Sequence, residues 1–160
     1  MTREALRSRW AAIRRSPRRV AGDRSGASAV EFALLAPILL LLAVGMAQFG
    51  IVLNQYIMLT EAVRDGARQL ALARGNSTPY TSTVNQVKSS AGTLAAARLT
   101  ITTTVNGTAC STDSTCQTAL SSASGQAAAV SATYPCQLRV MGINFVSSCT
   151  LSSSTTEMIE

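Results

Sequence analysis

The residues with the clearest chemical potential are four cysteines in the last third of the 160-residue chain: Cys110, Cys116, Cys136 and Cys149. Cysteine thiolates can bind zinc or pair as disulfides. The chain has no histidine and no paired C-x-x-C motifs, so we expect no metal site and no cofactor. Two disulfides formed in an oxidising compartment are the better interpretation. Four cysteines allow three pairings, among which short sequence separation favours Cys110–Cys116 and Cys136–Cys149.

No group of residues in the sequence has the pattern of a catalytic site. There is no histidine to act as a base and no glycine-rich loop after a predicted strand, and the acids Asp113, Glu157 and Glu160 stand apart from one another. The many serines and threonines lack a residue that would activate a nucleophile, and solvated strand surface explains them more simply. We therefore expect a protein that is not an enzyme and has no catalytic residues.

A single carboxylate, Glu31, precedes Phe32–Leu53, a run of 22 residues without a charge. At about 1.5 Å per residue, a helix of that length spans the roughly 30 Å hydrocarbon core of a bilayer. A buried core helix is disfavoured because no other part of the chain is apolar enough to surround it. A cleaved secretory signal is another alternative, with small residues at Gly45-Met46-Ala47, but the run is longer than a typical signal core. We expect an anchor that stays in the protein.

The net charge of +6 lies entirely in an N-terminal arm. Residues 1–24 hold eight arginines against two acids, whereas residues 25–75 and 76–160 each sum to zero. Arginines before the apolar run and none directly after it predict a cytoplasmic N-terminus and an exported C-terminal domain. The arm is either a short amphipathic helix on anionic lipid or, more simply, a solvated topology signal. The charge therefore predicts a lipid bilayer as a partner, and no nucleic acid.

The sequence predicts one continuous helix through the apolar run and beyond it. Ser28 and Glu31 fit an S-x-x-E capping box at its start, and Pro37 would bend it by removing one backbone hydrogen bond. Past the membrane the pattern becomes amphipathic until Gly75-Asn76 ends the helix. The apolar stripe of this second part is expected to contain Tyr56, Leu59, Val63 and Leu70. The chain then divides into a basic arm or leader (1–26), a transmembrane helix (27–54), a juxtamembrane amphipathic helix (55–75) and an exported domain (76–160).

The exported domain is predicted to be α+β, with a helix and a small antiparallel sheet. The predicted elements are a helix at Val84–Ala97 and strands at Leu99–Val105, Ala127–Tyr134 and Thr150–Ile159. Asn106-Gly107 is a turn signal after the first strand. Residues 110–125 are expected to be a polar loop closed by cysteines, and residues 135–149 a second loop. The core of such a domain is thin, and disulfides could offset that.

Two stretches of the sequence resemble the TadE-like family of the tight-adherence (Flp) pilus system. The first combines Arg24 and Gly26, at the end of a basic leader, with Ala29-Val30-Glu31-Phe32-Ala33-Leu34 and Pro37. The second is the juxtamembrane stretch Glu61-Ala62-Val63-Arg64-Asp65-Gly66-Ala67-Arg68. Together they cover about residues 24–74, while the exported region, with its last strand ending at Glu160, is similar only in layout. One departure is Phe32, where the pseudopilins that resemble Flp pilin carry tyrosine.

The resemblance implies a pilin-like minor pilin, or pseudopilin, of a bacterial secretion and pilus-assembly machine of the type IVb-like class. It implies an anchor in the bacterial cytoplasmic (inner) membrane, with the C-terminal domain outside the cytoplasm. The implied partners are other pilin subunits, pilus-assembly membrane proteins and a prepilin peptidase that would cut between Gly26 and Ala27. The alternative is a single-pass envelope protein with the same anchor and a disulfide-stabilised binding head.

Glu31 has a different role in each state of the leader. If the leader stays, Glu31 caps the first turn of the helix, where the helix dipole stabilises a carboxylate by roughly 0.3–1 kcal/mol. If the leader is cut, the new α-amino group of Ala27 lies one turn away and would pair with Glu31, or a neighbouring subunit's amine would. In pilins the analogous pair is thought to set subunit register. Gly45 and Gly50 would let another helix approach closely, although ordinary membrane-helix composition explains them equally well.

Overall fold

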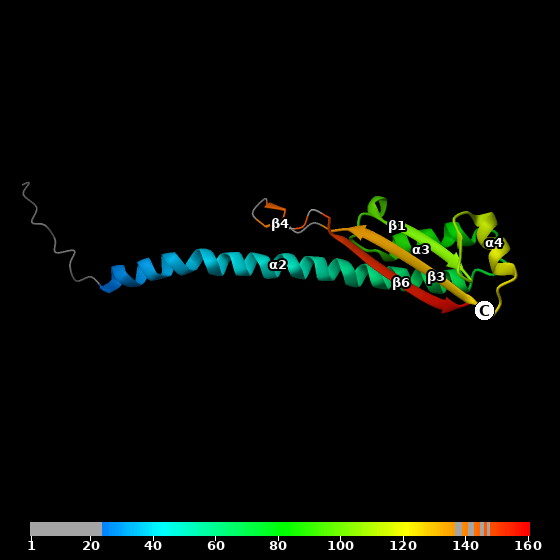
Figure 1. Cartoon of the computed structure of the whole chain (residues 1–160), viewed down its shortest axis with the longest axis horizontal. Coiled ribbons are helices and arrows are strands. Elements are labelled where there is room, and N and C mark those ends of the chain that lie inside the picture. Colours follow the sequence, from blue (N-terminus) through cyan, green and yellow to red (C-terminus); the bar gives the residue numbers. More distant parts are fainter. Residues whose placement is uncertain (1–23, 137–138, 141–142, 145, 147) are drawn as a thin grey trace, which may run out of the picture. The chain divides into compact units, whose positions relative to one another are not determined.

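The computed structural model of the protein describes residues 24–136, 139–140, 143–144, 146 and 148–160. The predicted basic arm lies outside the described residues, apart from its last three. The chain forms two compact units, one ending at Ala43 and the other comprising Val44–Glu160. Helix α2 (Arg24–Ala71) contributes to both units (Figure 1).

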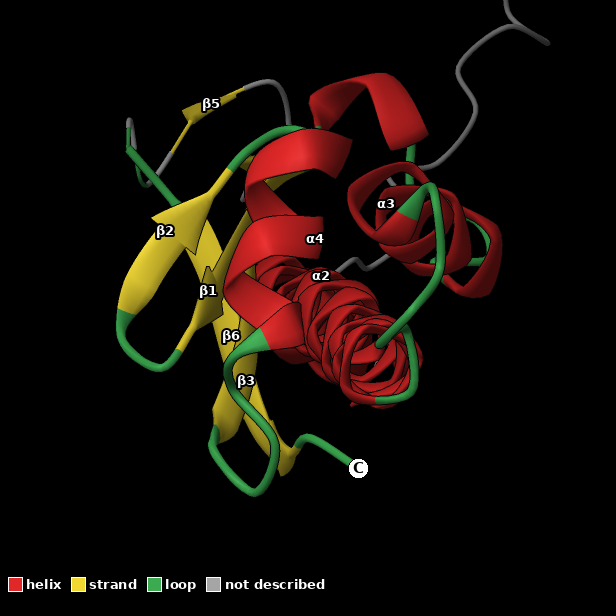
Figure 2. Cartoon of the chain, turned by 90° about the vertical axis from the view of Figure 1, so that its right-hand side faces the viewer, coloured by secondary structure: helices red, strands yellow, loops and turns green. Residues whose placement is uncertain are grey.

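The second unit consists of an antiparallel sheet with helices on one face (Figure 2). The sheet order is β2-β1-β3-β6, and every neighbouring pair is antiparallel. The strands are β1 (Thr100–Val105), β2 (Thr108–Cys110), β3 (Ala127–Pro135) and β6 (Thr150–Met158). The covering helices are the C-terminal part of α2, α3 (Pro79–Ser90) and α4 (Asp113–Ser121), and the 3-10 turn η1 (Ala96–Arg98) leads into β1. The predicted α+β fold, a long apolar helix followed by a small antiparallel sheet, is confirmed.

The two faces of the sheet differ because successive side chains of a strand point to opposite sides. On β3, Ala128, Val130, Ala132 and Tyr134 are buried, and the residues between them are at least partly exposed. The buried side chains face the helices and form the core with residues of α2, α3 and α4. The opposite face carries serines and threonines, among which Ser131 and its cross-strand neighbour on β6 share a hydrogen bond. The serines and threonines of this face are thus solvated strand surface.

The observed strands agree closely with the strands predicted from the sequence. Each of the three predicted strands is present, with bounds that differ by one residue. Asn106 and Gly107 form the two-residue turn between β1 and β2, with φ angles of 49° and 77°. Such positive φ values are required in the tight hairpin turn for which Asn-Gly is the usual sequence.

The second helix lies earlier in the chain than predicted. The prediction was Val84–Ala97, whereas α3 is Pro79–Ser90. Pro79 occupies the first helical turn, where its fixed φ and missing N–H are tolerated. Gly92 has a φ of 59°, which ends the helical path before the alanine-rich stretch that follows. The alanines therefore continue the apolar spacing without continuing the helix.

Two segments predicted as loops contain regular structure. Residues 110–125 were predicted as a polar loop, but they include α4 (Asp113–Ser121). The helix forms because Thr112 and Thr115 make a reciprocal capping box at its start. In the second predicted loop, the described residues include β4 (Arg139–Val140) paired antiparallel with β5 (Ile143–Asn144).

Helix α2 differs from the prediction at its start, at its end and on its apolar stripe. It begins at Arg24 and has no acid in its first turn, so Ser28 and Glu31 lie inside the helix and the predicted capping box is wrong. It ends at Ala71, before Gly75, because the last turn tightens: the Ala73 N–H bonds to the Leu70 carbonyl. Tyr56 is 43 % exposed because the covered part of the helix begins at Leu59.

Candidate functional site

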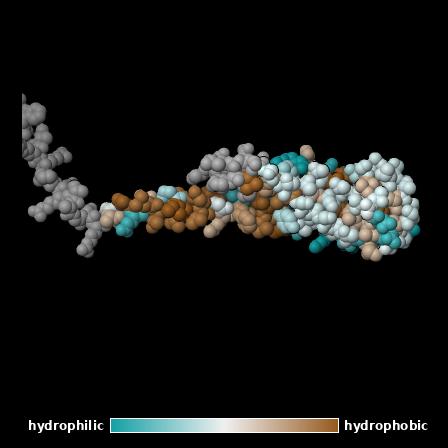
Figure 3. Space-filling view, in the orientation of Figure 1, coloured by the Kyte–Doolittle hydropathy of each residue, from teal (hydrophilic) through white to brown (hydrophobic). Residues whose placement is uncertain are grey.

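The N-terminal part of α2 exposes its large apolar side chains. Phe32, Leu34 and Met46 are 68, 71 and 72 % exposed, and brown side chains cover this part of the chain in Figure 3. The helix is long and apolar enough to cross a membrane, by length and composition. Apolar surface on this scale is unusual on a soluble monomer and marks a membrane or protein contact.

The residues predicted to define helix start and processing lie together at the beginning of α2. Gly26, Ala27, Glu31 and Val30 are all exposed, and Pro37 lies within the helix. A Cβ added to Gly26 would meet no other atom within 4 Å, so nothing packs against this side of the helix. The structure therefore presents these residues on an accessible helix surface and does not gather them into a pocket.

The juxtamembrane motif divides between two faces of α2. Ala62, Val63 and Ala67 are fully buried against the sheet, with Leu59 and Leu70 extending the same stripe. Glu61, Arg64 and Arg68 are exposed on the other side. The motif therefore has one face that packs on the sheet and one charged face that is exposed.

Gly66 is a point of close contact between α2 and α3. A Cβ at Gly66 would overlap Val87 Cγ2 and would touch Val130 Cγ1 at 3.7 Å. Glycine in a helix interior costs about 1 kcal/mol relative to alanine, so its presence needs a packing reason. The absent side chain supplies that reason, because it lets Val87 pack directly on the α2 backbone. The Oγ of Ser90 adds a polar contact nearby by donating a hydrogen bond of 2.8 Å to Asp65.

The structure pairs the four cysteines as Cys110–Cys116 and Cys136–Cys149, the pairing that sequence separation favoured. Cys110 and Cys116 are 3 and 0 % exposed, so the first disulfide joins β2 to α4 inside the core. The Thr103 hydroxyl donates to the Cys110 carbonyl and lies 3.6 Å from the Cys110 sulfur. The second disulfide closes the segment that contains β4 and β5.

A hydrogen-bonded clamp joins the start of α4 to α3. Asp113 Oδ1 accepts a hydrogen bond from the Thr81 N–H at 2.8 Å, and Oδ2 accepts one from the Thr81 hydroxyl at 2.6 Å. Both hydrogen bonds lower the pKa of Asp113 below its usual value of 3.8, and the bond from the Thr81 hydroxyl has the larger effect. The sequence suggested no partner for Asp113, because Thr81 lies in a helix that was predicted to begin later.

The clamp predicts a pH dependence of stability. A lowered pKa means that the carboxylate stabilises the fold at any pH above 3.8, and that this contribution is lost as the pH falls through the lower pKa of the folded protein. Thermal melts should therefore show a lower Tm for Asp113→Ala than for the native chain at pH 6, and the difference should shrink below about pH 4. Thr81→Val should reproduce part of the effect. A Tm difference that does not change with pH would contradict the clamp.

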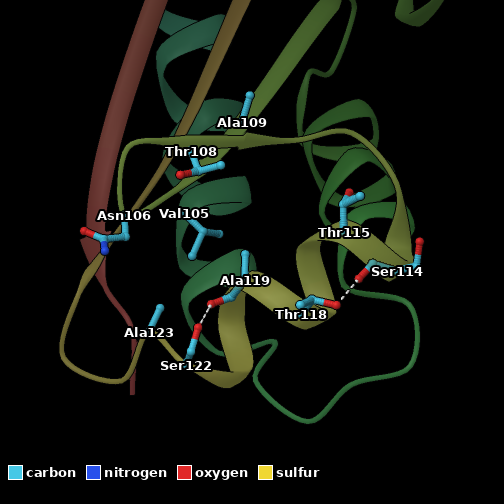
Figure 4. Close-up of a pocket in the computed structure, with 10 residues that line it drawn as sticks. All are labelled: Val105, Asn106, Thr108, Ala109, Ser114, Thr115, Thr118, Ala119, Ser122 and Ala123. Atoms are coloured by element: carbon cyan, nitrogen blue, oxygen red, sulfur yellow. Dashed lines mark hydrogen bonds between the residues drawn. The ribbon is translucent and has the colours of Figure 1, made fainter.

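A groove of about 570 Å³ lies between the β1–β2 hairpin and α4 (Figure 4). Its lining is uncharged, with hydroxyl, amide and small apolar side chains from both elements. Several of the hydroxyls already donate along the helix, as Thr118 does to the Ser114 carbonyl at 3.0 Å. The groove can therefore accept hydrogen bonds from a neutral polar ligand, but it offers no charge, base or nucleophile pair. In the part of the chain that the structure describes, no cluster of three or more His, Cys, Asp or Glu side chains could hold a metal ion.

Comparison with known proteins gives one match, and it lies within α2. The chain matches no curated protein and no solved structure. Residues 26–68 match the model of a family described as TadE-like protein. The matched range covers the apolar part of α2 and extends through the juxtamembrane motif as far as Arg68. TadE-like proteins are related to the tight-adherence pilus and are in general not enzymes. The resemblance predicted from the sequence is thus confirmed, and residues 26–68 of this chain are a TadE-like segment.

Proposed function

We propose that the chain is a membrane-anchored minor pilin or pseudopilin that takes part in assembling a tight-adherence pilus and its secretion machine. The observation that carries this proposal is that the TadE-like match covers both parts of α2, the exposed apolar segment and the motif that packs on the sheet. Such a helix would place its apolar segment in a membrane and contribute its later residues to the core of the head, the folded unit that contains the sheet. Its partners are then the bilayer, other pilin subunits and pilus-assembly membrane proteins.

The proposed topology follows from charge and hydropathy. Residues 1–26 form the cytoplasmic arm or leader, residues 27–54 cross the inner membrane, residues 55–75 contain the juxtamembrane helix, which ends at Ala71, and residues 76–160 form the exported domain. The arginine-rich arm supports a cytoplasmic N-terminus. The two disulfides support an oxidising environment for the domain.

Processing by a prepilin peptidase between Gly26 and Ala27 is the second part of the proposal. The bond lies near the start of α2, where fraying of a helix end exposes the backbone. Mass spectrometry of the membrane-extracted protein tests it directly. A mature chain that starts at Ala27 supports processing, a chain that keeps Gly26 contradicts it, and a chain that starts near Gln48 would contradict the anchor as well.

Replacing Glu31 by alanine tests the role of the carboxylate in assembly. A carboxylate in an apolar environment needs a charged or hydrogen-bonded partner, and the amine of Ala27 in the same or a neighbouring subunit would be that partner. We expect Glu31→Ala to remain in the membrane after carbonate extraction but to lower the number of pili per cell at least tenfold. Glu31→Asp, which keeps the charge, should retain more pili. Normal piliation in Glu31→Ala would mean that the carboxylate has no assembly role.

The alternative function, a binding head on the same anchor, is favoured by one observation. The uncharged groove beside the Cys110–Cys116 disulfide is large enough for a small ligand. A defect in surface attachment in cells that carry groove variants and normal pili would favour this function over assembly.

A further inference from the structure

Strands β3 and β6 run beside the C-terminal part of α2 in a defined direction. The Glu160 N–H bonds to the Ala71 carbonyl at 3.4 Å, so the chain after β6 ends at the last turn of the helix. A Cβ at Gly66 would lie 3.7 Å from Cγ1 of Val130, which places the middle of β3 at an earlier level of the helix. The other end of the sheet, at Pro135, therefore lies toward the N-terminal end of α2.

That end of the sheet reaches the level of the membrane surface in the proposed topology. The strand from Val130 to Pro135 is about 17 Å long, at about 3.3 Å per residue. The same length of helix contains about 11 residues, so the sheet ends at most about 11 residues before Gly66, next to the end of the proposed membrane span. Tyr56, 43 % exposed, lies at this level and has the amphipathic ring typical of a membrane interface.

The segment that leaves the sheet at this end is apolar for its length. Of the twelve residues between Cys136 and Cys149, six are large and apolar and one, Arg139, is charged. Val146 is 41 % exposed. The two ends of the segment are held together, because the Cys136 N–H bonds to the Cys149 carbonyl at 3.1 Å and a disulfide joins the two residues. β4 lies past the ends of β3 and β6 (Figure 1), in the same unit as the sheet and the later part of α2.

The register of β4 and β5 sorts their residues onto two faces. Val140 pairs directly with Ile143, so both lie on one face of the β4–β5 hairpin. Arg139 and Asn144 form the neighbouring pair and lie on the other face. The hairpin thus has an apolar face and a polar face that carries a cation. Such a pattern suits the boundary between lipid headgroups and acyl chains.

The acids of residues 76–160 lie away from the hairpin. Glu157 and Glu160 are at the end of β6, beside the last turn of α2. Asp113 is bonded to Thr81 in the first turn of α3, shortly after α2 ends. The end of the exported domain that is far from the membrane therefore carries its negative charge.

Two of the three cations of the same residues lie at the opposite end. Arg98 is exposed, and its Nη2 donates a hydrogen bond of 3.1 Å to the Pro135 carbonyl. Its guanidinium also lies 5.2 Å from the centre of the Tyr134 ring, which fixes it beside the end of β3. Arg139 is in β4, and the third cation, Lys88, is in the last turn of α3. The domain is neutral as a whole, but its membrane-facing end is basic.

We propose that the β4–β5 hairpin enters the surface of the membrane that anchors the chain. Val140 and Ile143 lie at the outer ends of the acyl chains, and Arg98 and Arg139 lie among anionic headgroups. The inference rests on the proposed function, because the anchor sets the level of the membrane surface. A lipid surface fits better than a protein partner, since the apolar face and the cations gather at the one end that the anchor brings to the bilayer. This second attachment holds the head in one rotation about α2.

Lipid quenching of tryptophan fluorescence measures the contact directly. The full-length chain, with its single tryptophan removed by Trp10→Phe, is reconstituted into vesicles of phosphatidylethanolamine and phosphatidylglycerol that contain acyl-brominated lipid. We expect a tryptophan introduced by Ile143→Trp to be quenched at least threefold more than one introduced by Met158→Trp. Met158, 64 % exposed at the far end of β6, is the matched control. Val140→Trp should give the same result as Ile143→Trp.

Three outcomes would overturn the proposal, and they are distinguishable. Equal quenching at Ile143→Trp and Met158→Trp, in chains that float with the vesicles, would overturn the hairpin contact and leave the anchor standing. Protection of Ile143→Trp from both brominated lipid and aqueous iodide would show that protein covers the hairpin. A chain that does not float with the vesicles would overturn the anchor, and the hairpin contact with it.

Varying the headgroup tests the role of the cations. Replacing phosphatidylglycerol by phosphatidylcholine should lower the quenching at Ile143→Trp at least twofold. Adding Arg98→Gln should remove about half of this dependence on phosphatidylglycerol, whereas Lys88→Gln, an exposed cation away from the hairpin, should leave it unchanged. Quenching that is the same in both lipids, or equal effects of the two substitutions, would overturn the headgroup contact.

Discussion

Replacing Gly66 by alanine is expected to destabilise the head by about 1–3 kcal/mol, the usual cost of overpacking a well-packed core. Alanine is the better helix former by about 1 kcal/mol, so propensity alone predicts the opposite sign. The expected loss arises because the added Cβ would overlap Val87 Cγ2 on α3. Either α3 moves away from α2, or the side chain of Val87 leaves its place in the core. Thermal melts of the full-length protein in detergent should show a Tm several degrees lower.

Gly50→Ala is the matched control for this prediction, because it is the same substitution in the same helix. A Cβ at Gly50 would meet no other atom within 4 Å, so Tm should be unchanged or slightly higher. Combining Gly66→Ala with Val87→Ala should cost less than the sum of the two single changes, because the second substitution removes the overlapping methyl group. Equal Tm values for Gly66→Ala and Gly50→Ala would contradict the close packing of α3 on α2.

Removing the Cys110–Cys116 disulfide is expected to cost about 2–3 kcal/mol of stability, since cross-links of this kind restrict the unfolded chain. The cysteines are six residues apart, and both lie in the core, so the double Cys→Ala variant also loses buried packing. Limited proteolysis should cut the variant head much faster than the native head, and carbonate extraction should still find the anchor in the membrane.

Loss of the second disulfide is the matched comparison. Cys136 and Cys149 close a segment that contains β4 and β5 and lies outside the four-stranded sheet. Removing them should therefore speed cleavage within that segment and leave β1, β3 and β6 protected. Equal sensitivity of the two variants across the whole head would mean that both disulfides stabilise the same cooperative unit.

Much of the fold could be predicted because its signals are local. The alternation of apolar residues with threonine or serine predicts the strands. Asn106-Gly107 predicts the hairpin turn, because this dipeptide tolerates the positive φ values that the turn requires. The long helix follows from the length of the apolar run. The division of the juxtamembrane motif into buried alanines and exposed charges also follows from helical periodicity.

The features that could not be predicted depend on contacts between distant parts of the chain. Helix α4 is short and rich in hydroxyl groups, which compete with helical hydrogen bonds. It is held by a disulfide to β2 and by the clamp between Asp113 and Thr81. The role of Gly66 likewise depends on Val87 in another helix, although an interior glycine in a helix was a signal that packing occurs there.

The start of α2 illustrates a different failure. Ser28 and Glu31 match the capping-box pattern, but the helix already begins at Arg24, so the pattern lies inside it. A short motif of this kind is met by chance wherever a helix extends past it. The consequence for Glu31 is specific: it is not needed to cap the helix, which leaves an assembly contact as the role to test.

We propose above all that residues 26–68 make this chain an anchored subunit of pilus assembly. The most direct test deletes the chain from the cells that make it and counts pili by electron microscopy, with the native chain and a chain lacking residues 26–68 supplied in turn. We predict that pili are lost, return with the native chain and do not return with the shortened one. Unchanged piliation after removal, or recovery with the shortened chain, would contradict the claim.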